Sequence, residues 1–285
     1  MKPAPFDYIR AQSLDEALDA LSAGAGEAIV LAGGQTLVPM MAMRLARPAT
    51  LVDLNEIASL AGIEETPHGL RIRAMTRQAP ALDSEVVRRR APLLAKALSF
   101  VGHQQTRNRG TVGGSCAHAD PSAEIPLTAI TLDAEMTLAR KSGKRAVKAR
   151  DFFEGALATA RDPDEVLTEV VFPTWNGRIG VGFQEVSPRH GDFAIVAAAV
   201  QLELDADGVC TRAAIGVGGA SPAAVRVAEA EAALVGKRIS GTLAAQAARA
   251  TDAVISPGDD LHATAAYRRR AARVLVERAI LEAAA

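Results

Sequence analysis

Two glycine-rich segments constrain this chain more than any other feature. The first, Ala32-Gly33-Gly34-Gln35-Thr36, directly follows an apolar run, and the second is Gly110-Thr111-Val112-Gly113-Gly114-Ser115. Glycine has no Cβ, so its backbone can come close to a ligand, and successive N–H groups in such a turn can bind an anion. Because the two segments lie far apart in the sequence, we expect them to form two sides of one pyrophosphate cradle.

Taken alone, the first segment is also compatible with an ordinary turn, because neither GxGxxG nor GxxxxGK[ST] occurs in the chain. Gln35 and Thr36 favour the binding hypothesis, since polar residues at the start of a helix are typical of anion sites. No Walker lysine follows, so we do not expect a nucleoside triphosphate.

The second segment runs into a stretch rich in small, polar and turn-forming residues, Cys116 to Pro126. We expect a structured loop here, because long ordered loops are usually functional. Asp120 and Glu124 could accept hydrogen bonds from ribose or ribityl hydroxyls. The alternative is that both are solvent-exposed helix caps.

Composition excludes several classes of protein. The chain has 285 residues and a net charge of -1, which gives no reason to expect nucleic acid or a membrane surface as a partner. Its two cysteines cannot supply the four thiolates of an all-cysteine iron–sulfur cluster. No apolar stretch is long enough to predict a membrane span, and no signal peptide is evident, so we expect a cytoplasmic location.

Periodicity and turn residues predict three domains: an α/β domain at 1–55, an α+β domain at 56–176, and a third domain at 177–285. In the third we expect a three-stranded sheet with helices on one face. A basic run, Arg268-Arg269-Arg270, lies on its last helix and predicts a solvated face or a subunit contact. The predicted strands are 28–31, 50–53, 70–75, 136–138, 146–148, 166–172, 180–186, 193–204 and 209–216. The predicted helices are 13–24, 37–45, 86–100 with a break near Pro92, 222–235, 243–254 and 264–284.

Taken together, the motifs resemble the FAD-binding medium subunit of molybdenum hydroxylases, the carbon monoxide dehydrogenase/xanthine dehydrogenase family. The resemblance spans essentially the whole chain. It is carried by the first glycine segment and by the runs Arg107–Gly114, Ala119–Pro126, Arg189–Val196, Gly216–Gly219 and His262–Arg269.

The resemblance implies an α+β fold of the PCMH type (vanillyl-alcohol-oxidase-like), with two FAD-binding subdomains and a smaller C-terminal domain. It implies that the two glycine segments hold the FAD pyrophosphate from opposite sides, and that Asp120 and Glu124 bind the sugar-like chains. The pyrophosphate residues expected are Ala32, Gly33, Gly34, Gln35, Thr36 and Leu37 on one side, and Gly110, Thr111, Gly113, Gly114 and Ser115 on the other.

Three further positions follow from the resemblance. Leu167 falls where the family packs an aliphatic side chain on the isoalloxazine ring, and Phe193 falls where some members place a shielding aromatic. Gln184 occupies a position at which xanthine dehydrogenases carry a lysine near the flavin. A neutral glutamine would stabilise negative charge on the reduced ring less than a lysine does.

The resemblance also implies an oxidoreductase subunit without acid–base residues of its own. Electrons would come from two [2Fe–2S] clusters on a small subunit, after molybdenum chemistry on a large subunit, and leave to NAD, a quinone or oxygen. The implied assembly is a dimer of heterotrimers. The alternatives are a self-sufficient flavin oxidoreductase of the same fold and a non-redox nucleotide-binding module.

Overall fold

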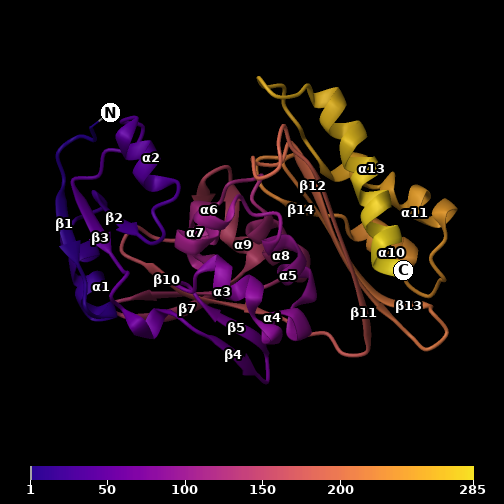
Figure 1. Cartoon of the computed structure of the whole chain (residues 1–285), viewed down its shortest axis with the longest axis horizontal. Helices are drawn as coiled ribbons and strands as arrows, with labels where there is room; N and C mark the ends of the chain where they lie inside the picture. Colours follow the sequence, from indigo (N-terminus) through magenta and orange to yellow (C-terminus); the bar gives the residue numbers. More distant parts are fainter. Residues whose placement is uncertain (1) are drawn as a thin grey trace.

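The computed structural model describes residues 2–285 and is elongated, with the N-terminal part at one end and the C-terminal part at the other (Figure 1). The elements form three main sheets that follow one another along the chain. The cofactor-site candidates of the sequence lie mainly where the first two sheets meet.

The first sheet is parallel and has the strand order β1-β3-β2. The expected β-loop-α-β unit is present, with the first glycine segment between β2 and α2. Ser13 caps α1, since its Oγ accepts a hydrogen bond from the Glu16 N–H at 3.2 Å. The strand β1 was not predicted, because its four residues are mostly exposed and carry no alternating pattern. The elements are β1 (Asp7–Arg10), α1 (Leu14–Ala23), β2 (Ala28–Leu31), α2 (Leu37–Ala42) and β3 (Thr50–Asp53).

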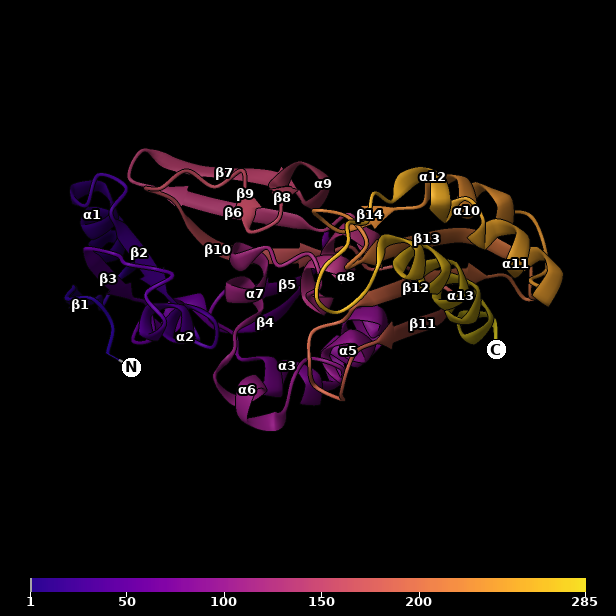
Figure 2. The same ribbon diagram turned by 90° about the horizontal axis from the view of Figure 1, so that it is seen from above.

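The second sheet is antiparallel and has the order β4-β5-β10-β6-β7. A short ribbon, β8 with β9, lies beside it, and helices α3 to α9 connect and cover its strands (Figure 2). The strands are β4 (Ile63–Thr66), β5 (Gly69–Arg73), β6 (Glu135–Arg140), β7 (Gly143–Lys148), β8 (Phe153–Gly155), β9 (Ala158–Thr159) and β10 (Val166–Phe172). The helices are α3 (Gln78–Asp83), α4 (Glu85–Arg90), α5 (Pro92–Leu98), α6 (Gln104–Arg109), α7 (Val112–His118), α8 (Glu124–Leu132) and α9 (Ala149–Phe152), with a 3-10 turn at Ala58–Leu60.

The helix break predicted near Pro92 is confirmed. Helix α4 ends at Arg90, and Pro92 is the first residue of α5, where its missing N–H leaves no unmade helical bond. Helix α8 is different, because all nine of its residues are buried. A helix that is buried on every side must lie between other elements. Here α8 packs on strands of the C-terminal sheet on one side and against α5, α7 and α9 on the other.

The C-terminal sheet has four strands, in the order β11-β12-β13-β14, and not the expected three. The short strand β14 pairs with β13 and occupies the start of the stretch that was predicted as helix 222–235. The helix α10 therefore begins only at Ala228. The strands are β11 (Arg178–Val186), β12 (Val196–Leu204), β13 (Cys210–Gly218) and β14 (Val225–Arg226); the helices are α10 (Ala228–Leu234), α11 (Gly241–Ala248), α12 (Thr251–Val254) and α13 (Ala265–Ala284).

Helices α10, α11 and α13 cover one face of this sheet, as expected, while α5 and α8 pack on the other (Figures 1 and 2). Gly180 and Gly182 let α13 lie directly on β11, since a Cβ at Gly182 would come within 2.9 Å of the Ala279 Cα. Within residues 2–285, none of the helices combines the length and the apolar character needed to span a membrane.

The interpretation of the basic run on α13 as a solvated face is wrong for Arg268. This side chain is buried, and its Nη1 donates to the carbonyl oxygens of Ile195 (2.5 Å) and Gly219 (2.7 Å). Its Nη2 donates to Asp260 Oδ2 at 2.6 Å. Arg268 therefore ties α13 to the turns at the ends of β12 and β13, which the sequence run alone could not indicate.

Candidate cofactor-binding site

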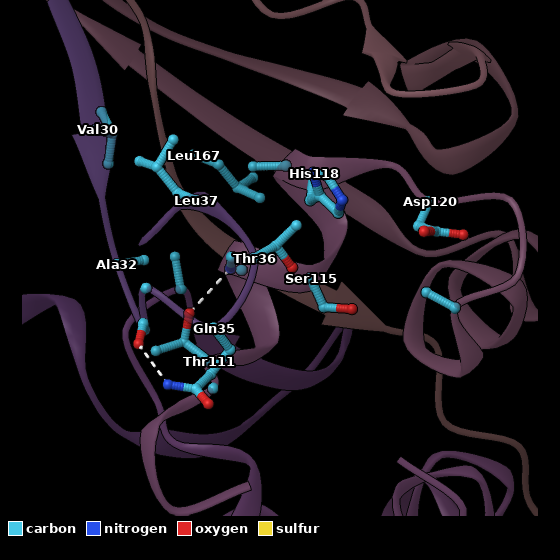
Figure 3. Close-up of a pocket in the computed structure, with 18 of the residues that line it drawn as sticks. Val30, Ala32, Gln35, Thr36, Leu37, Thr111, Ser115, His118, Asp120 and Leu167 are labelled. Carbon is cyan, nitrogen blue, oxygen red and sulfur yellow. Dashed lines mark hydrogen bonds between the residues drawn. The ribbon is translucent and has the colours of Figure 1, made fainter. Parts of the chain in front are cut away.

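A cavity of about 460 Å³ lies between the first and second sheets, and both glycine segments line it (Figure 3). Its size falls in the range typical of small-molecule and cofactor sites. Fifteen of the sixteen residues expected at the site line this cavity: Ala32, Gly33, Gly34, Gln35, Thr36, Leu37, Gly110, Thr111, Gly113, Gly114, Ser115, Asp120, Glu124, Leu167 and Phe193. The structure thus brings together residues that are separated by up to 161 positions in the chain.

The first glycine segment is in direct contact with the second. A Cβ added to Gly33 would collide with the Arg109 carbonyl oxygen and would lie 2.8 Å from the Gly110 Cα. Gly34 has a φ of +70°, a conformation that glycine adopts without steric cost. The side chain of Gln35 folds back, with its Nε2 donating to the Gly33 carbonyl oxygen at 3.2 Å. No residue with a Cβ fits at Gly33 unless the two segments move apart.

The second segment is helical, and not part of the long loop that was expected. Thr111 caps α7, and its Oγ1 accepts a hydrogen bond from the Gly114 N–H at 2.9 Å. The next helix, α8, begins at Glu124, so only 119–123 connects them. A run of small residues still forms a helix here because tertiary packing selects it: Gly113 lies so close to Ala74 that a Cβ would be 2.6 Å from the Ala74 Cα.

The two carboxylic acids predicted at the site have different environments. Asp120 lines the cavity and its Oδ1 accepts a hydrogen bond from the Ser122 N–H at 2.8 Å, which holds the turn before α8. Glu124 is only 5% exposed. Burial raises the pKa of Glu124 to about 8, against the opposing hydrogen bond from its own N–H, and the nearby Glu185 and Asp120 raise it further. Glu124 is therefore mostly a neutral acid at pH 7 and can donate a hydrogen bond into the cavity.

The apolar part of the lining includes the two hydrophobic residues that the resemblance singled out. Leu167 is buried in β10, beside a bulge between Leu167 and Glu169, and it lines the cavity together with Val30 and Leu37, which Figure 3 also labels. Phe193 precedes β12 and is 57% exposed, so it stands at the edge of the cavity, with room to cover a ligand.

Gln184 is the exception, and its prediction as a residue near the flavin is not supported. Its Nε2 donates to Glu282 Oε2 on α13 at 2.9 Å, and it does not line the cavity. Side chains alternate between the two faces of a strand. In β11, Gly182 and Gln184 face α13, whereas Phe183 faces the middle domain, where its ring lies 4.9 Å from that of Phe100.

Sequence reasoning missed several residues that line the cavity, of which Gln78 is the clearest. It is 5% exposed, and its Oε1 has no hydrogen-bond partner within residues 2–285. Its backbone N–H donates to the Gly110 carbonyl oxygen at 2.9 Å. No sequence signal could have found it, because Gln78 is an ordinary first residue of the short helix α3.

Comparison with known proteins assigns this arrangement to a family. Residues 4–175 match the family described as the FAD binding domain in molybdopterin dehydrogenase. Residues 182–283 match the CO dehydrogenase flavoprotein C-terminal domain. The chain therefore belongs to the FAD-binding flavoprotein family of the molybdenum hydroxylases, and its cofactor is FAD.

Individual relatives agree over the full length. The 6-hydroxypseudooxynicotine dehydrogenase complex subunit alpha of Paenarthrobacter nicotinovorans is 38% identical over 283 residues, which cover 99% of this chain and 96% of the relative. A chain of carbon monoxide dehydrogenase from Hydrogenophaga pseudoflava superimposes with a TM-score of 0.95 at 35% identity, covering 99% of this chain and 98% of the other. A chain of quinoline 2-oxidoreductase from Pseudomonas putida 86 gives a TM-score of 0.94 at 37% identity, covering 100% and 98%. The expected α+β FAD-binding fold and the expected membership of an oxidoreductase family are thus confirmed.

Proposed function

We propose that this chain is the electron-transferring flavoprotein subunit of a molybdenum hydroxylase, which receives electrons from [2Fe–2S] clusters of a partner subunit and delivers them to an external acceptor. The observation that carries the proposal is the single cavity lined by both glycine segments, in a chain of this family. We also propose the division into domains at 1–55, 56–176 and 177–285, since each contains one of the three main sheets.

The residues of the cavity fit FAD. The close approach of Gly33 to the second segment leaves backbone, and no side chain, between the two sides of the cradle. Within residues 2–285 the buried Gln78 Oε1 has no hydrogen-bond partner, and the protonated Glu124 can donate a hydrogen bond. We propose that the two glycine segments hold the pyrophosphate, that Asp120 and Glu124 bind the hydroxyl-bearing chains, and that Leu167 and Phe193 contact the ring system.

Bound FAD supplies one- and two-electron redox chemistry, which is the property of the cofactor itself. The residues of this chain bind and orient the cofactor. Leu167 and Phe193 provide apolar surface that excludes water, and the backbone of the two glycine segments fixes the position of the pyrophosphate. We propose no acid, base or nucleophile among them. This division agrees with a subunit that does not itself transform an organic substrate.

The names of the relatives support a complex of several subunits. One relative is a complex subunit alpha, and others are medium chains of carbon monoxide dehydrogenase. We propose an iron–sulfur small subunit and a molybdenum-binding large subunit as partners, in a dimer of heterotrimers located in the cytoplasm. The external acceptor would be NAD, a quinone or oxygen.

The proposal is tested with the purified chain and then with its complex. First, the absorbance spectrum is recorded and the released cofactor is identified by chromatography; we expect non-covalent FAD in a 1:1 ratio. Second, the flavin spectrum is followed when substrate is added to the chain alone and to the complex; we expect bleaching only when the iron–sulfur partner is present.

Each alternative has its own outcome. Turnover of a donor by the isolated chain would indicate a self-sufficient flavin oxidoreductase. A folded, colourless chain that binds ADP but takes up no FAD would indicate a non-redox nucleotide-binding module.

A further inference from the structure

The two glycine segments belong to the first and the second of the proposed domains, so their separation depends on contacts made between these domains. The first segment lies between β2 and α2 of the N-terminal domain, and the second comprises the link between α6 and α7 and the first turn of α7. They touch at Gly33 and at the Arg109–Gly110 peptide. A van der Waals contact between backbones limits how closely the segments approach, but it does not prevent them from separating.

A chain of side-chain hydrogen bonds also joins the two segments. The Arg77 Nη1 donates to the Arg109 carbonyl oxygen, immediately before Gly110. The Arg77 Nη2 donates to Asn55 Oδ1 at 2.5 Å, and the Asn55 Nδ2 donates to the Ala32 carbonyl oxygen at 3.0 Å. Two side chains, Arg77 and Asn55, thus connect the backbone of the first segment to that of the second. We call this pair the clamp.

Each half of the clamp is fixed to its own side. The Asn55 N–H donates to Asp53 Oδ1 at 2.8 Å, and the Tyr8 hydroxyl donates to Asp53 Oδ2 at 2.5 Å. Burial alone would raise the pKa of Asp53, but these hydrogen bonds and those of the Asn55 amide lower it, so Asp53 remains a charged acceptor. Asn55 is therefore held in place from the N-terminal sheet.

Arg77 is fixed to the second segment through its backbone. It forms an isolated antiparallel bridge with Thr111, and the N–H of the next residue, Gln78, donates to the Gly110 carbonyl oxygen at 2.9 Å. The Arg77 side chain does not line the cavity. Its guanidinium therefore acts on the cavity only through the groups to which it donates, and its planar fork suits two acceptors, here the Arg109 carbonyl oxygen and Asn55 Oδ1.

We propose that Arg77 and Asn55 are positioning residues, which set the separation of the two glycine segments and thereby the affinity for the pyrophosphate of FAD. The inference rests on the proposed FAD site. It assigns a role in cofactor retention to two residues that lie outside both glycine motifs. Breaking any of the three hydrogen bonds of the clamp lets the segments separate, and the backbone groups that face the ligand then lose their common geometry.

The test measures the Kd for FAD of the full-length apoprotein by flavin fluorescence, together with its melting temperature. We expect Arg77→Met and Asn55→Ala each to raise this Kd by about 10- to 100-fold, the range for losing a charge-assisted hydrogen bond that orders a site. The double variant should bind about as weakly as either single variant, because the second change removes a connection that is already broken. Arg77→Lys, which keeps one donor, should fall between wild type and Arg77→Met.

Arg73→Met is the matched control. The Arg73 Nη1 also donates to a backbone carbonyl, that of Ser59 at 2.5 Å, but this bond does not join the glycine segments. We expect its Kd for FAD to stay within about twofold of wild type, since a change this small is worth less than about 0.5 kcal/mol.

Three results would overturn the clamp: a wild-type Kd for Arg77→Met, additive effects in the double variant, or equal weakening by Arg73→Met. If Arg77→Met does not fold, Asn55→Ala and Arg77→Lys decide the question by the same criteria. Failure of the wild-type chain to bind FAD would overturn the proposed cofactor site itself. Wild-type binding with unchanged affinity in the variants would overturn the clamp alone.

Discussion

The substitution Gly33→Ala adds one methyl group at the point where the two glycine segments meet. The added Cβ would collide with the Arg109 carbonyl oxygen and lie 2.8 Å from the Gly110 Cα and 3.0 Å from the Arg109 carbonyl carbon. All three atoms belong to the backbone, so no side-chain rotation can relieve the clash. The segments must separate, or the backbone of one must distort.

The magnitude follows from overpacking. Extra methyl groups in a packed interior cost about 1–3 kcal/mol, and rigid backbone neighbours place this site near the upper end, at about 2–3 kcal/mol. At about 2–4 °C per kcal/mol, the melting temperature of the apoprotein should fall by about 4–12 °C. Because the cradle opens, the Kd for FAD should rise at least about tenfold.

Gly155→Ala is the control, since a Cβ at Gly155 would meet nothing within 4 Å and its φ is not positive. We expect it to stay within about 0.5 kcal/mol of wild type in stability and to leave FAD binding unchanged. The assay is thermal unfolding by circular dichroism together with FAD titration of both variants. The reasoning would be refuted if Gly33→Ala melted within about 1 °C of Gly155→Ala and bound FAD equally well.

Three further substitutions test other parts of the structure. The pKa of Glu124 is raised in the folded protein, so its contribution to stability is complete below about pH 4.5 and is lost as the pH rises to about 8. Across that window the free energy of unfolding of the wild-type apoprotein should fall by up to about 1.4 kcal/mol per pH unit relative to Glu124→Gln. Urea unfolding at pH 5 and pH 8 checks this, and an equal difference between the two proteins at both pH values would contradict it. Arg268→Met should cost about 1–3 kcal/mol in urea unfolding, because it leaves the carbonyl oxygens of Ile195 and Gly219 without this donor. The exposed Arg270→Met should stay within about 0.5 kcal/mol, and equal effects would argue against the buried role of Arg268. Gln184→Lys should pair with Glu282 and leave the flavin midpoint potential unchanged in a redox titration, while a rise of more than about 30 mV would place this side chain near the flavin after all.

Local features of the structure were predictable because they depend on neighbours in the chain. Ser13 caps α1, Pro92 starts α5, and Thr264 caps α13 by accepting a hydrogen bond from the Tyr267 N–H at 3.3 Å. Each depends on a few adjacent backbone groups, which the residue type alone can satisfy. The two glycine segments were recognisable for the same reason, since a position that tolerates no Cβ is visible as glycine in the sequence.

The sequence did not determine which face of a strand or helix each side chain occupies. Gly180 and Gly182 let α13 lie on one face of β11. Because side chains alternate between the two faces of a strand, Gln184 lies on that same face, toward α13. In the sequence, Arg268 is one of three consecutive arginines that predict an exposed face. In the structure, its side chain points toward the turns next to β12 and β13 and donates to backbone carbonyl oxygens there. A periodic pattern defines faces without saying what packs on them.

Only the tertiary structure decided the electrostatics and connections of the site. Glu124 is mostly neutral at pH 7 because α8 is buried on every side, and this burial depends on residues distant in sequence. The contacts that join Ala32 to Asn55, and Asn55 to Arg77, cross up to 23 positions of the chain and leave no motif. Glycine in the sequence indicates where the backbone approaches another group closely, because the steric limit applies to a single residue. The side chains that hold two such segments together depend on the tertiary structure, because a hydrogen bond requires only that its partners be close in space.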